Sequence, residues 1–207
     1  LGINMAKGNA ADALINIATG FSEKSIPCSE LLESQLSNFA RDNHPAVRTV
    51  ILRRLPRLQS LAPNLGWKLF EIAMQKTSIG LWAMAEPCLY YAYHQHFERV
   101  DPWLEELQIN GSGKDLETWA RISALAALSS KVDFNVLLEK LKAIGTSEAW
   151  RGAASVWSDS DNYQRHNIQC REGLGAGMAP ENLHAAVVAK KFRRLFQETK
   201  AIAIIPK

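Results

Sequence analysis

Two clusters of basic residues are the side chains whose type and spacing best suit binding. The first comprises Arg53, Arg54 and Arg57, and the second comprises Lys190, Lys191, Arg193 and Arg194. Guanidinium and ammonium groups bind carboxylates and phosphates through charge-assisted hydrogen bonds. We therefore predict both clusters as partner-binding residues, for an acidic protein surface or for nucleic-acid phosphates. The simpler alternative is a solvated helix face whose long side chains cover apolar neighbours.

Two glycine-rich segments resemble nucleotide-binding loops but lack the required spacing. Residues 111–114 read Gly-Ser-Gly-Lys, yet Gln108 stands where a phosphate-binding loop has its first glycine, and Asp115 replaces its hydroxyl residue. Residues 173–177 read Gly-Leu-Gly-Ala-Gly, which is not the dinucleotide-binding pattern. We interpret residues 110–113 as a loop and the best candidate for an internal subdivision, and residues 173–177 as a break between helices. No cofactor is predicted.

Metal and catalytic sites are not indicated either. His94 and His96 are two residues apart, which places them on different faces of a helix. The three cysteines, Cys28, Cys88 and Cys170, lie far apart, so we expect buried thiols in a reducing, cytoplasmic setting. No hydrolase signature is present. We therefore predict a chain that is not an enzyme, with no catalytic residue and no metal site.

The composition is that of an ordinary globular protein. Apolar residues make up 47% and charged residues 22% of the 207 residues, which argues against disorder. The net charge of +3 is small for a nucleic-acid-binding domain. No apolar run reaches the roughly 20 residues that span a bilayer, so no membrane association is expected. Because the chain begins with Leu1, we expect it to be part of a longer protein.

The stretch from residue 42 to residue 58 predicts a corner that leads into an amphipathic helix. Pro45 suits the first helical position because its missing N–H would have no partner there. Apolar residues then recur at helical spacing, and we expect the helix to continue past Pro56 with a kink. These apolar positions are Val47, Val50, Ile51, Leu55 and Leu58.

Other segments show the same helical period, and no segment alternates as a strand would. Ser29 predicts the N-cap of a helix that runs through Ala40. We further expect that Gly20 ends the first helix, that Asp101 opens a short one and that Pro180 begins the last. The predicted fold class is all-α.

A weak internal repeat supports a particular all-α architecture. A basic residue followed by small residues recurs at Lys7, Arg48, Arg121 and Arg151. The intervals between these basic positions match the roughly 30 to 45 residues of helical-hairpin repeats, if the interval from Arg48 to Arg121 holds two repeats. We predict a right-handed α-α superhelix of about five stacked helix pairs, as one α-solenoid domain over residues 1–207.

The corner resembles the second helix of a HEAT repeat, through Asp42 before the turn and the Val47-Arg48 pair after it. In that family the Asp and Arg tie the turn to the neighbouring repeat. The resemblance implies a structural role for the repeat signature Asp42, Val47, Arg48, Arg121 and Arg151.

Residues 4–14, 42–55, 67–70 and 149–157 together resemble the α-solenoid sensor regions of bacterial antiviral STAND NTPases, although Lys7 stands where an Arg is expected. That resemblance implies a protein-binding module with a phage protein as partner and no ATPase of its own.

Two alternatives stay open: a HEAT-like nucleic-acid-binding module similar to the HEAT-fold DNA glycosylases, and a structural scaffold domain. An exposed apolar groove would favour protein binding. A continuous basic stripe through Arg48, Arg53, Arg57 and Arg121 would favour nucleic acid.

Overall fold

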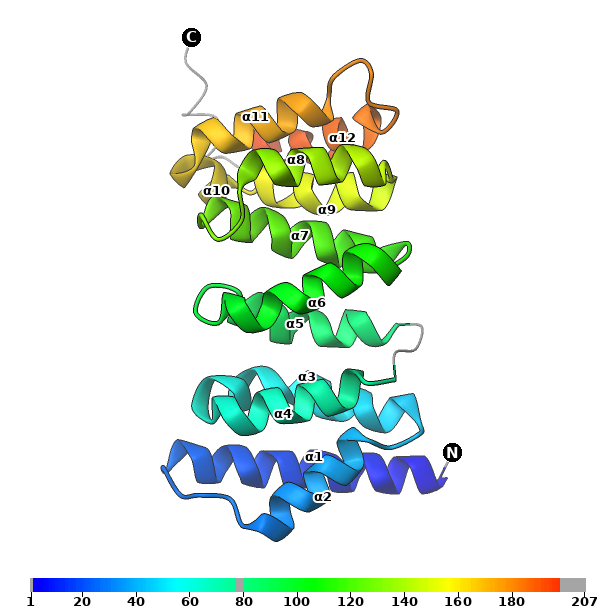
Figure 1. Ribbon diagram of the computed structural model, residues 1–207, viewed down its shortest axis with the longest axis vertical. Helices are drawn as coiled ribbons and strands as arrows, with labels where there is room; N and C mark the ends of the chain where they lie inside the picture. The colour runs from blue at the N-terminus through cyan, green and yellow to red at the C-terminus, as the bar shows by residue number, and fades with distance from the viewer. Residues whose placement is uncertain (1, 77–79, 198–207) are drawn as a thin grey trace. The chain divides into compact units, whose positions relative to one another are not determined.

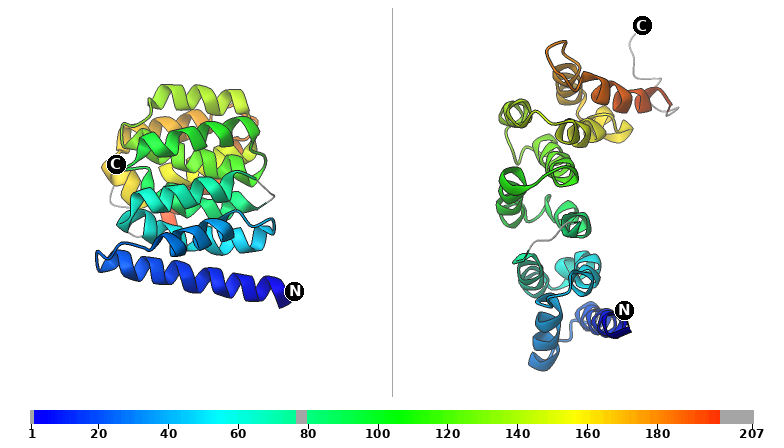
Figure 2. Two further views of the ribbon diagram at one scale, coloured as in Figure 1. Left: turned by 60° about the horizontal axis from the view of Figure 1, so that its bottom comes forward. Right: turned by 90° about the vertical axis from the view of Figure 1, so that its right-hand side faces the viewer.

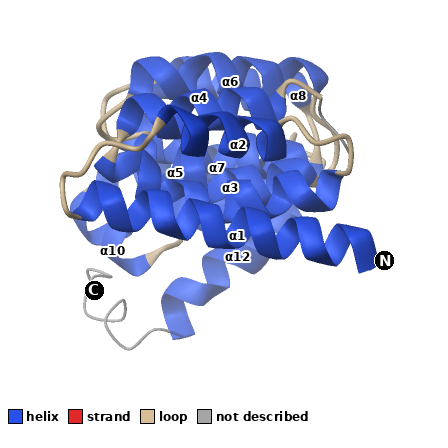
Figure 3. Ribbon diagram, turned by 90° about the horizontal axis from the view of Figure 1, so that it is seen from below, coloured by secondary structure: helices blue, strands red, loops and turns tan. Residues whose placement is uncertain are grey.

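The computed structural model describes residues 2–76 and 80–197, and every regular element in these ranges is an α-helix (Figure 3). The all-α prediction is therefore confirmed. The described residues form twelve helices, two more than five pairs would need, and they divide into unit 1, up to Ala92, and unit 2, from Tyr93. None of these helices is both long and apolar enough to cross a membrane.

Unit 1 contains five helices in two layers. They are α1 (Gly2–Glu23), α2 (Glu30–Ala40), α3 (Pro45–Leu61), α4 (Pro63–Met74) and α5 (Leu81–Ala92). α3 packs between α1 and α5, and α2 packs against α4 in the second layer (Figures 1 and 2). α3 also contacts α2 and α4, so it is the central helix of this unit.

The sequence of α3 explains both its start and its burial. Pro45 is its first residue, and the His44 side chain caps it by accepting a hydrogen bond from the Ala46 N–H at 3.3 Å. The helix continues past Pro56 to Leu61, as predicted. Its buried apolar face consists of Val47, Ile51, Leu52, Leu55 and Leu58.

The two neighbouring helices show one correct and one wrong boundary prediction. Ser29 is the N-cap of α2, and its hydroxyl accepts a hydrogen bond from the Leu32 N–H at 3.3 Å. α1, however, does not end at Gly20 but continues to Glu23. Its last turn is held against α3 because Glu23 pairs with Arg57.

Unit 2 is built around α9. Its helices are α6 (Phe97–Asn110), α7 (Lys114–Leu128), α8 (Phe134–Ile144), α9 (Ser147–Trp157), α10 (Ser160–Arg165), α11 (Asn167–Gly177) and α12 (Ala185–Gln197). α9 packs against α7, and it also contacts α11 and α12. Among the described residues of unit 2, the largest buried side chains are those of Trp119, Trp150 and Trp157. The 111–113 loop joins α6 to α7 inside this unit, and the division of the chain lies instead after Ala92.

Three boundary predictions in unit 2 are wrong. α6 begins at Phe97 rather than Asp101 and runs through Pro102, burying Val100 near its start. Residues 173–177 belong to α11 and do not break the chain. Gly173 and Gly177 instead allow the helix to pack closely against Trp157 and Val188. Pro180 lies in the turn before α12, which begins at Ala185.

Candidate functional site

The corner before α3 joins two neighbouring helices. Asp42 forms an ion pair with Lys7 of α1 at 2.9 Å, and its other oxygen accepts a hydrogen bond from the His44 N–H at 2.8 Å. Arg48 is 5% exposed and donates hydrogen bonds to the carbonyl oxygens of Ala73, at 3.0 Å, and Lys76. The Ala73 carbonyl is in the last turn of α4, where orphan acceptors need donors, and Lys76 follows two residues after the helix ends. Asp42 and Arg48 therefore hold α1 and α4 to α3.

Asp42 is expected to make the stability of the fold depend on pH. Partial burial acts to raise the pKa of Asp42, but the hydrogen bond from His44 and the Lys7 ammonium outweigh it and hold the pKa below its usual value. A carboxyl with a lowered folded-state pKa contributes stability above its unfolded pKa, about 3.9, and this contribution is lost as pH falls through the lower folded-state value. We expect Asp42→Asn to be less stable than the wild type at pH 7, with the difference shrinking below about pH 4.

Thermal unfolding of both proteins from pH 7 down to pH 2 measures this dependence. Asp101→Asn, which removes an exposed carboxylate of α6, is the matched control and should unfold as the wild type does across the range. Equal stability of Asp42→Asn and wild type at pH 7 would contradict the role assigned to Asp42.

The first predicted basic cluster lies on α3 and faces carboxylates of α1. Arg54 pairs with Asp12 at 2.8 Å, and Arg57 pairs with Glu23 at 3.0 Å. The hydrogen bond from Arg54 holds the pKa of Asp12 below its usual value. Arg53 is exposed on the same helix. Two of the three arginines thus join α1 to α3.

The basic stripe that would favour nucleic acid is interrupted within unit 1. Arg48 is buried, and its guanidinium is directed at backbone carbonyls rather than at solvent. Arg54 and Arg57 form ion pairs with carboxylates of α1. Among the described residues of unit 1, this leaves no continuous row of exposed guanidinium groups from Arg48 to Arg57.

Arg121 and Arg151 come together in unit 2 on one carboxylate. Glu117 accepts from Arg121 at 3.0 Å along α7 and from Arg151 of α9 at 3.4 Å. Their common partner is largely buried, with 18% of its side chain exposed. Arg151 therefore links α9 to α7, and Arg121 pairs with the same carboxylate within α7.

The second predicted basic cluster lies on α12. This helix buries Val188 and Leu195, and it exposes Lys190 and Arg193. Lys191 is half-buried, and the Arg194 side chain is outside the described part of the structure. Lys190 and Arg193 are therefore on the solvent side of an amphipathic helix.

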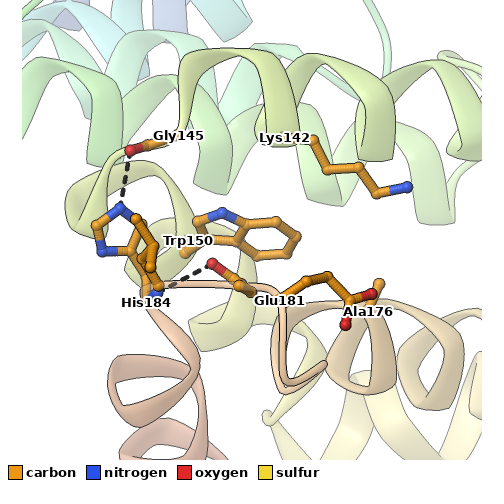
Figure 4. Close-up of a pocket in the computed structure, with 8 residues that line it drawn as sticks. Lys142, Gly145, Trp150, Ala176, Glu181 and His184 are labelled. Carbon is orange, nitrogen blue, oxygen red and sulfur yellow. Dashed lines mark hydrogen bonds between the residues drawn. The ribbon is translucent and has the colours of Figure 1, made fainter.

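A hollow of unit 2 was not predicted from the sequence. It has a volume of about 360 Å³ and lies at the ends of α8 and α11, against α9 and the turn before α12. Its lining residues are Lys142, Gly145, Trp150, Ala176, Glu181, Asn182, Leu183 and His184. Figure 4 shows Trp150 between Lys142, from α8, and Glu181, from the turn. The hollow thus has an aromatic floor and one charge of each sign.

Hydrogen bonds hold the turn that forms one wall of this hollow. His184 Nε2 lies 2.8 Å from the Gly145 carbonyl oxygen, which lies at the left-handed C-cap of α8 (Figure 4). Asn182 donates to the Gly177 carbonyl at 2.7 Å and accepts from the His184 N–H at 3.0 Å. Leu183 lies between these two anchored residues and is 94% exposed. The turn therefore holds an apolar side chain out in solvent.

The sequence pattern did not indicate this site, because Pro180 predicted the start of a helix rather than a turn. One local signal was available. An asparagine two residues after a proline favours a turn, since its side chain can bond to the backbone two residues on. The partner at Gly145 is 39 residues away in sequence and could not be inferred.

The cysteines do not add a chemical site. Burial raises the pKa of Cys170 to about 12 and raises that of Cys88 further above its usual range, so both stay protonated thiols at neutral pH. In the part of the chain that the structure describes, no group of three metal-ligating side chains comes together.

Comparison with known proteins gives no relative: no family model, no curated protein and no solved structure matches this chain. The class that the fold defines is an all-α protein of two compact helical units.

Proposed function

We propose that this chain is a protein-binding module of the α-solenoid type, built of stacked HEAT-like helical hairpins. Support comes from the packing inside each unit, where α3 lies between α1 and α5, and α9 between α7 and α12. Asp42, Arg48 and Arg151 each bond across neighbouring helices, in keeping with the tying role that the HEAT resemblance implies, whereas Arg121 pairs with Glu117 within its own helix. Stacked hairpins of this kind present extended binding surfaces.

The observation that carries a binding role is Leu183 beside the hollow of unit 2. A single exposed leucine is common on protein surfaces. Leu183 differs because it is held by anchored neighbours on both sides, so little conformational entropy would be lost when a partner covers it. An apolar side chain of the partner can pack on Leu183 while its charged neighbours meet Lys142 and Glu181.

The partner class follows from the chemistry of this site and from the resemblance described above. A mixed-charge, partly apolar surface suits a folded protein better than a polyanion. We infer that the chain is the recognition region of a larger cytoplasmic NTPase in antiphage defence, and that a phage protein is the ligand. The exposed basic side chains Lys190 and Arg193 of α12 would extend the contact.

Affinity capture with a charge substitution at Leu183 tests this proposal. The tagged parent protein is purified from phage-infected and uninfected cells as wild type, Leu183→Glu and Ile168→Glu. Ile168 is the matched control, since it is 80% exposed and lies at the other end of α11 from Ala176. We expect a phage protein to be captured by the wild type and Ile168→Glu, with at least tenfold less captured by Leu183→Glu, on the order of a lost interface hot spot.

Two outcomes would contradict the proposal. Equal capture by Leu183→Glu would exclude the hollow as the binding site. Recovery of DNA or RNA that is lost as the salt concentration rises would favour the nucleic-acid-binding alternative.

A further inference from the structure

The hollow of unit 2 contains one charged group that is not neutralised by any other described residue. Glu181 lines the hollow and is exposed, and in the part of the chain that the structure describes its carboxylate forms no hydrogen bond or ion pair. Lys142 also lines the hollow, but its ammonium group pairs at 2.9 Å with Glu139, which lies one turn earlier on α8. The charge of Lys142 is thus balanced within α8, whereas the charge of Glu181 is not balanced.

The hydrogen-bond donors of two other lining residues are already engaged. Asn182 Nδ2 donates to the Gly177 carbonyl oxygen at 2.7 Å. His184 Nε2 lies 2.8 Å from the Gly145 carbonyl oxygen, and because a carbonyl oxygen can only accept, Nε2 carries the proton. Both bonds hold the wall of the hollow, so these donors are not available to an incoming acceptor. Glu181, by contrast, offers two carboxylate oxygens to an incoming donor.

The charges of the hollow favour a cationic ligand over an anionic one. An anionic side chain would have to replace Glu139 at Lys142, and it would then lie in the same hollow as the Glu181 carboxylate, where like charges repel. A cationic side chain would meet Glu181 without displacing an existing pair. Charge complementarity of this kind decides which partners are accepted.

The size and the apolar lining of the hollow favour a long side chain over a small ion. Its volume of about 360 Å³ is at the lower end of the range for ligand pockets, about 300–1,000 Å³, and suits one side chain. Trp150 forms the floor between Lys142 and Glu181 (Figure 4), and Leu183 adds an apolar wall. The methylene groups of an arginine can pack on such a lining. Its planar guanidinium group binds a carboxylate through two parallel hydrogen bonds and stacks on aromatic rings.

We propose that the hollow receives an arginine side chain of the partner protein, and that the Glu181 carboxylate binds its guanidinium group. The stem of this arginine packs between Trp150 and Leu183. The inference rests on the proposed function, and it names the residue type that the partner places at the site.

Titration with three dipeptides tests the proposal. The 207-residue chain is mixed with acetyl-Leu-Arg-amide, acetyl-Leu-citrulline-amide or acetyl-Leu-Glu-amide, and the backbone amide signals of Leu183 and Gly145 are followed by NMR. Citrulline has the shape of arginine without its charge. We expect the arginine dipeptide to shift both signals and to bind about fivefold more tightly than the citrulline dipeptide, the upper end for a solvent-accessible ion pair.

Two variants, each of which removes one charge from the hollow, locate the contact. In Glu181→Gln the preference for arginine over citrulline should disappear, because the carboxylate is lost. Lys142→Gln is the matched control, since both residues are exposed. This control should bind the arginine dipeptide at least as tightly as the wild type does, because a neighbouring cation has been removed.

Three results would overturn the proposal. The first is equal binding of the arginine and citrulline dipeptides, or no shift of the Leu183 and Gly145 signals with any dipeptide. The second is a preference for arginine that persists in Glu181→Gln. The third is tighter binding of the glutamate dipeptide, which would assign the contact to Lys142.

The capture experiment separates failure of this inference from failure of the proposed function. If Leu183→Glu loses the captured phage protein while Glu181→Gln retains it, the hollow is a binding site and only the arginine contact is rejected. If Leu183→Glu and Glu181→Gln both capture as much as the wild type, the proposed function itself is rejected.

Discussion

Gly152→Ala is expected to lower the free energy of unfolding by about 3 kcal/mol, at the upper end of the cost of overpacking a core. The added Cβ would overlap the Glu117 carbonyl oxygen and lie 3.0 Å from the Glu117 carbonyl carbon and 3.2 Å from the Ala120 Cβ. Two of these three atoms belong to the backbone, so no side-chain rotation can relieve the overlap. The helices α7 and α9 would have to move apart, which would also disturb the Glu117 ion pairs.

Urea denaturation followed by tryptophan fluorescence measures this change, because Trp119 and Trp150 are buried in unit 2. Gly175→Ala is the matched control. Its Cβ would have no neighbour within 4 Å, and alanine is about 0.5–1 kcal/mol better than glycine in a helix. Gly175→Ala should therefore be neutral or stabilising. A Gly152→Ala protein as stable as this control would contradict the close packing of α7 on α9.

Trp157→Ala is expected to cost about 4 kcal/mol, the usual loss for truncating a buried tryptophan. Trp157 is fully buried, and its ring lies beside Phe134 of α8, with ring centres 5.8 Å apart. On α11, a Cβ at Gly173 would lie 2.6 Å from the Trp157 ring. The Trp157 side chain thus fills the space between α8, α9 and α11, and its removal would take away a contact that these three helices share.

A double-mutant cycle gives this prediction a sharper form. Gly173→Ala alone should destabilise the protein, because its Cβ collides with the indole ring. In Trp157→Ala the ring is absent, so the added methyl group fills part of the cavity. The two losses should then be less than additive by about 1 kcal/mol or more. Strict additivity, measured by the same urea denaturation, would show that Gly173 and Trp157 do not share a packing site.

The roles of the basic residues show why a charge cluster is a weak guide to binding. Arg53, Arg54 and Arg57 are neighbours in sequence, and partner binding and a solvated face were both consistent with them. Carboxylates 42 and 34 residues away on α1 pair with Arg54 and Arg57. Sequence spacing contains no information about such partners, since the approach of α1 to α3 depends on the packing of both helices.

The sequence by itself determined the helical class and the local ends of several helices. Period and composition predicted an all-α chain, Ser29 predicted the start of α2, and Pro45 predicted the start of α3. These predictions succeeded because an N-cap hydroxyl and a proline at the first position act on their own turn of backbone. Such interactions reach only three or four residues along the chain.

Only the tertiary structure decided where the glycines serve packing and where a site forms. Residues 173–177 continue α11 because Gly173 meets Trp157 and Gly177 meets Val188, which repays the low helix propensity of glycine. The hollow beside Leu183 exists because His184 reaches Gly145 from 39 residues away. Both features depend on contacts between helices, and the free energy of burying these contacts outweighs the local preferences that the sequence displays.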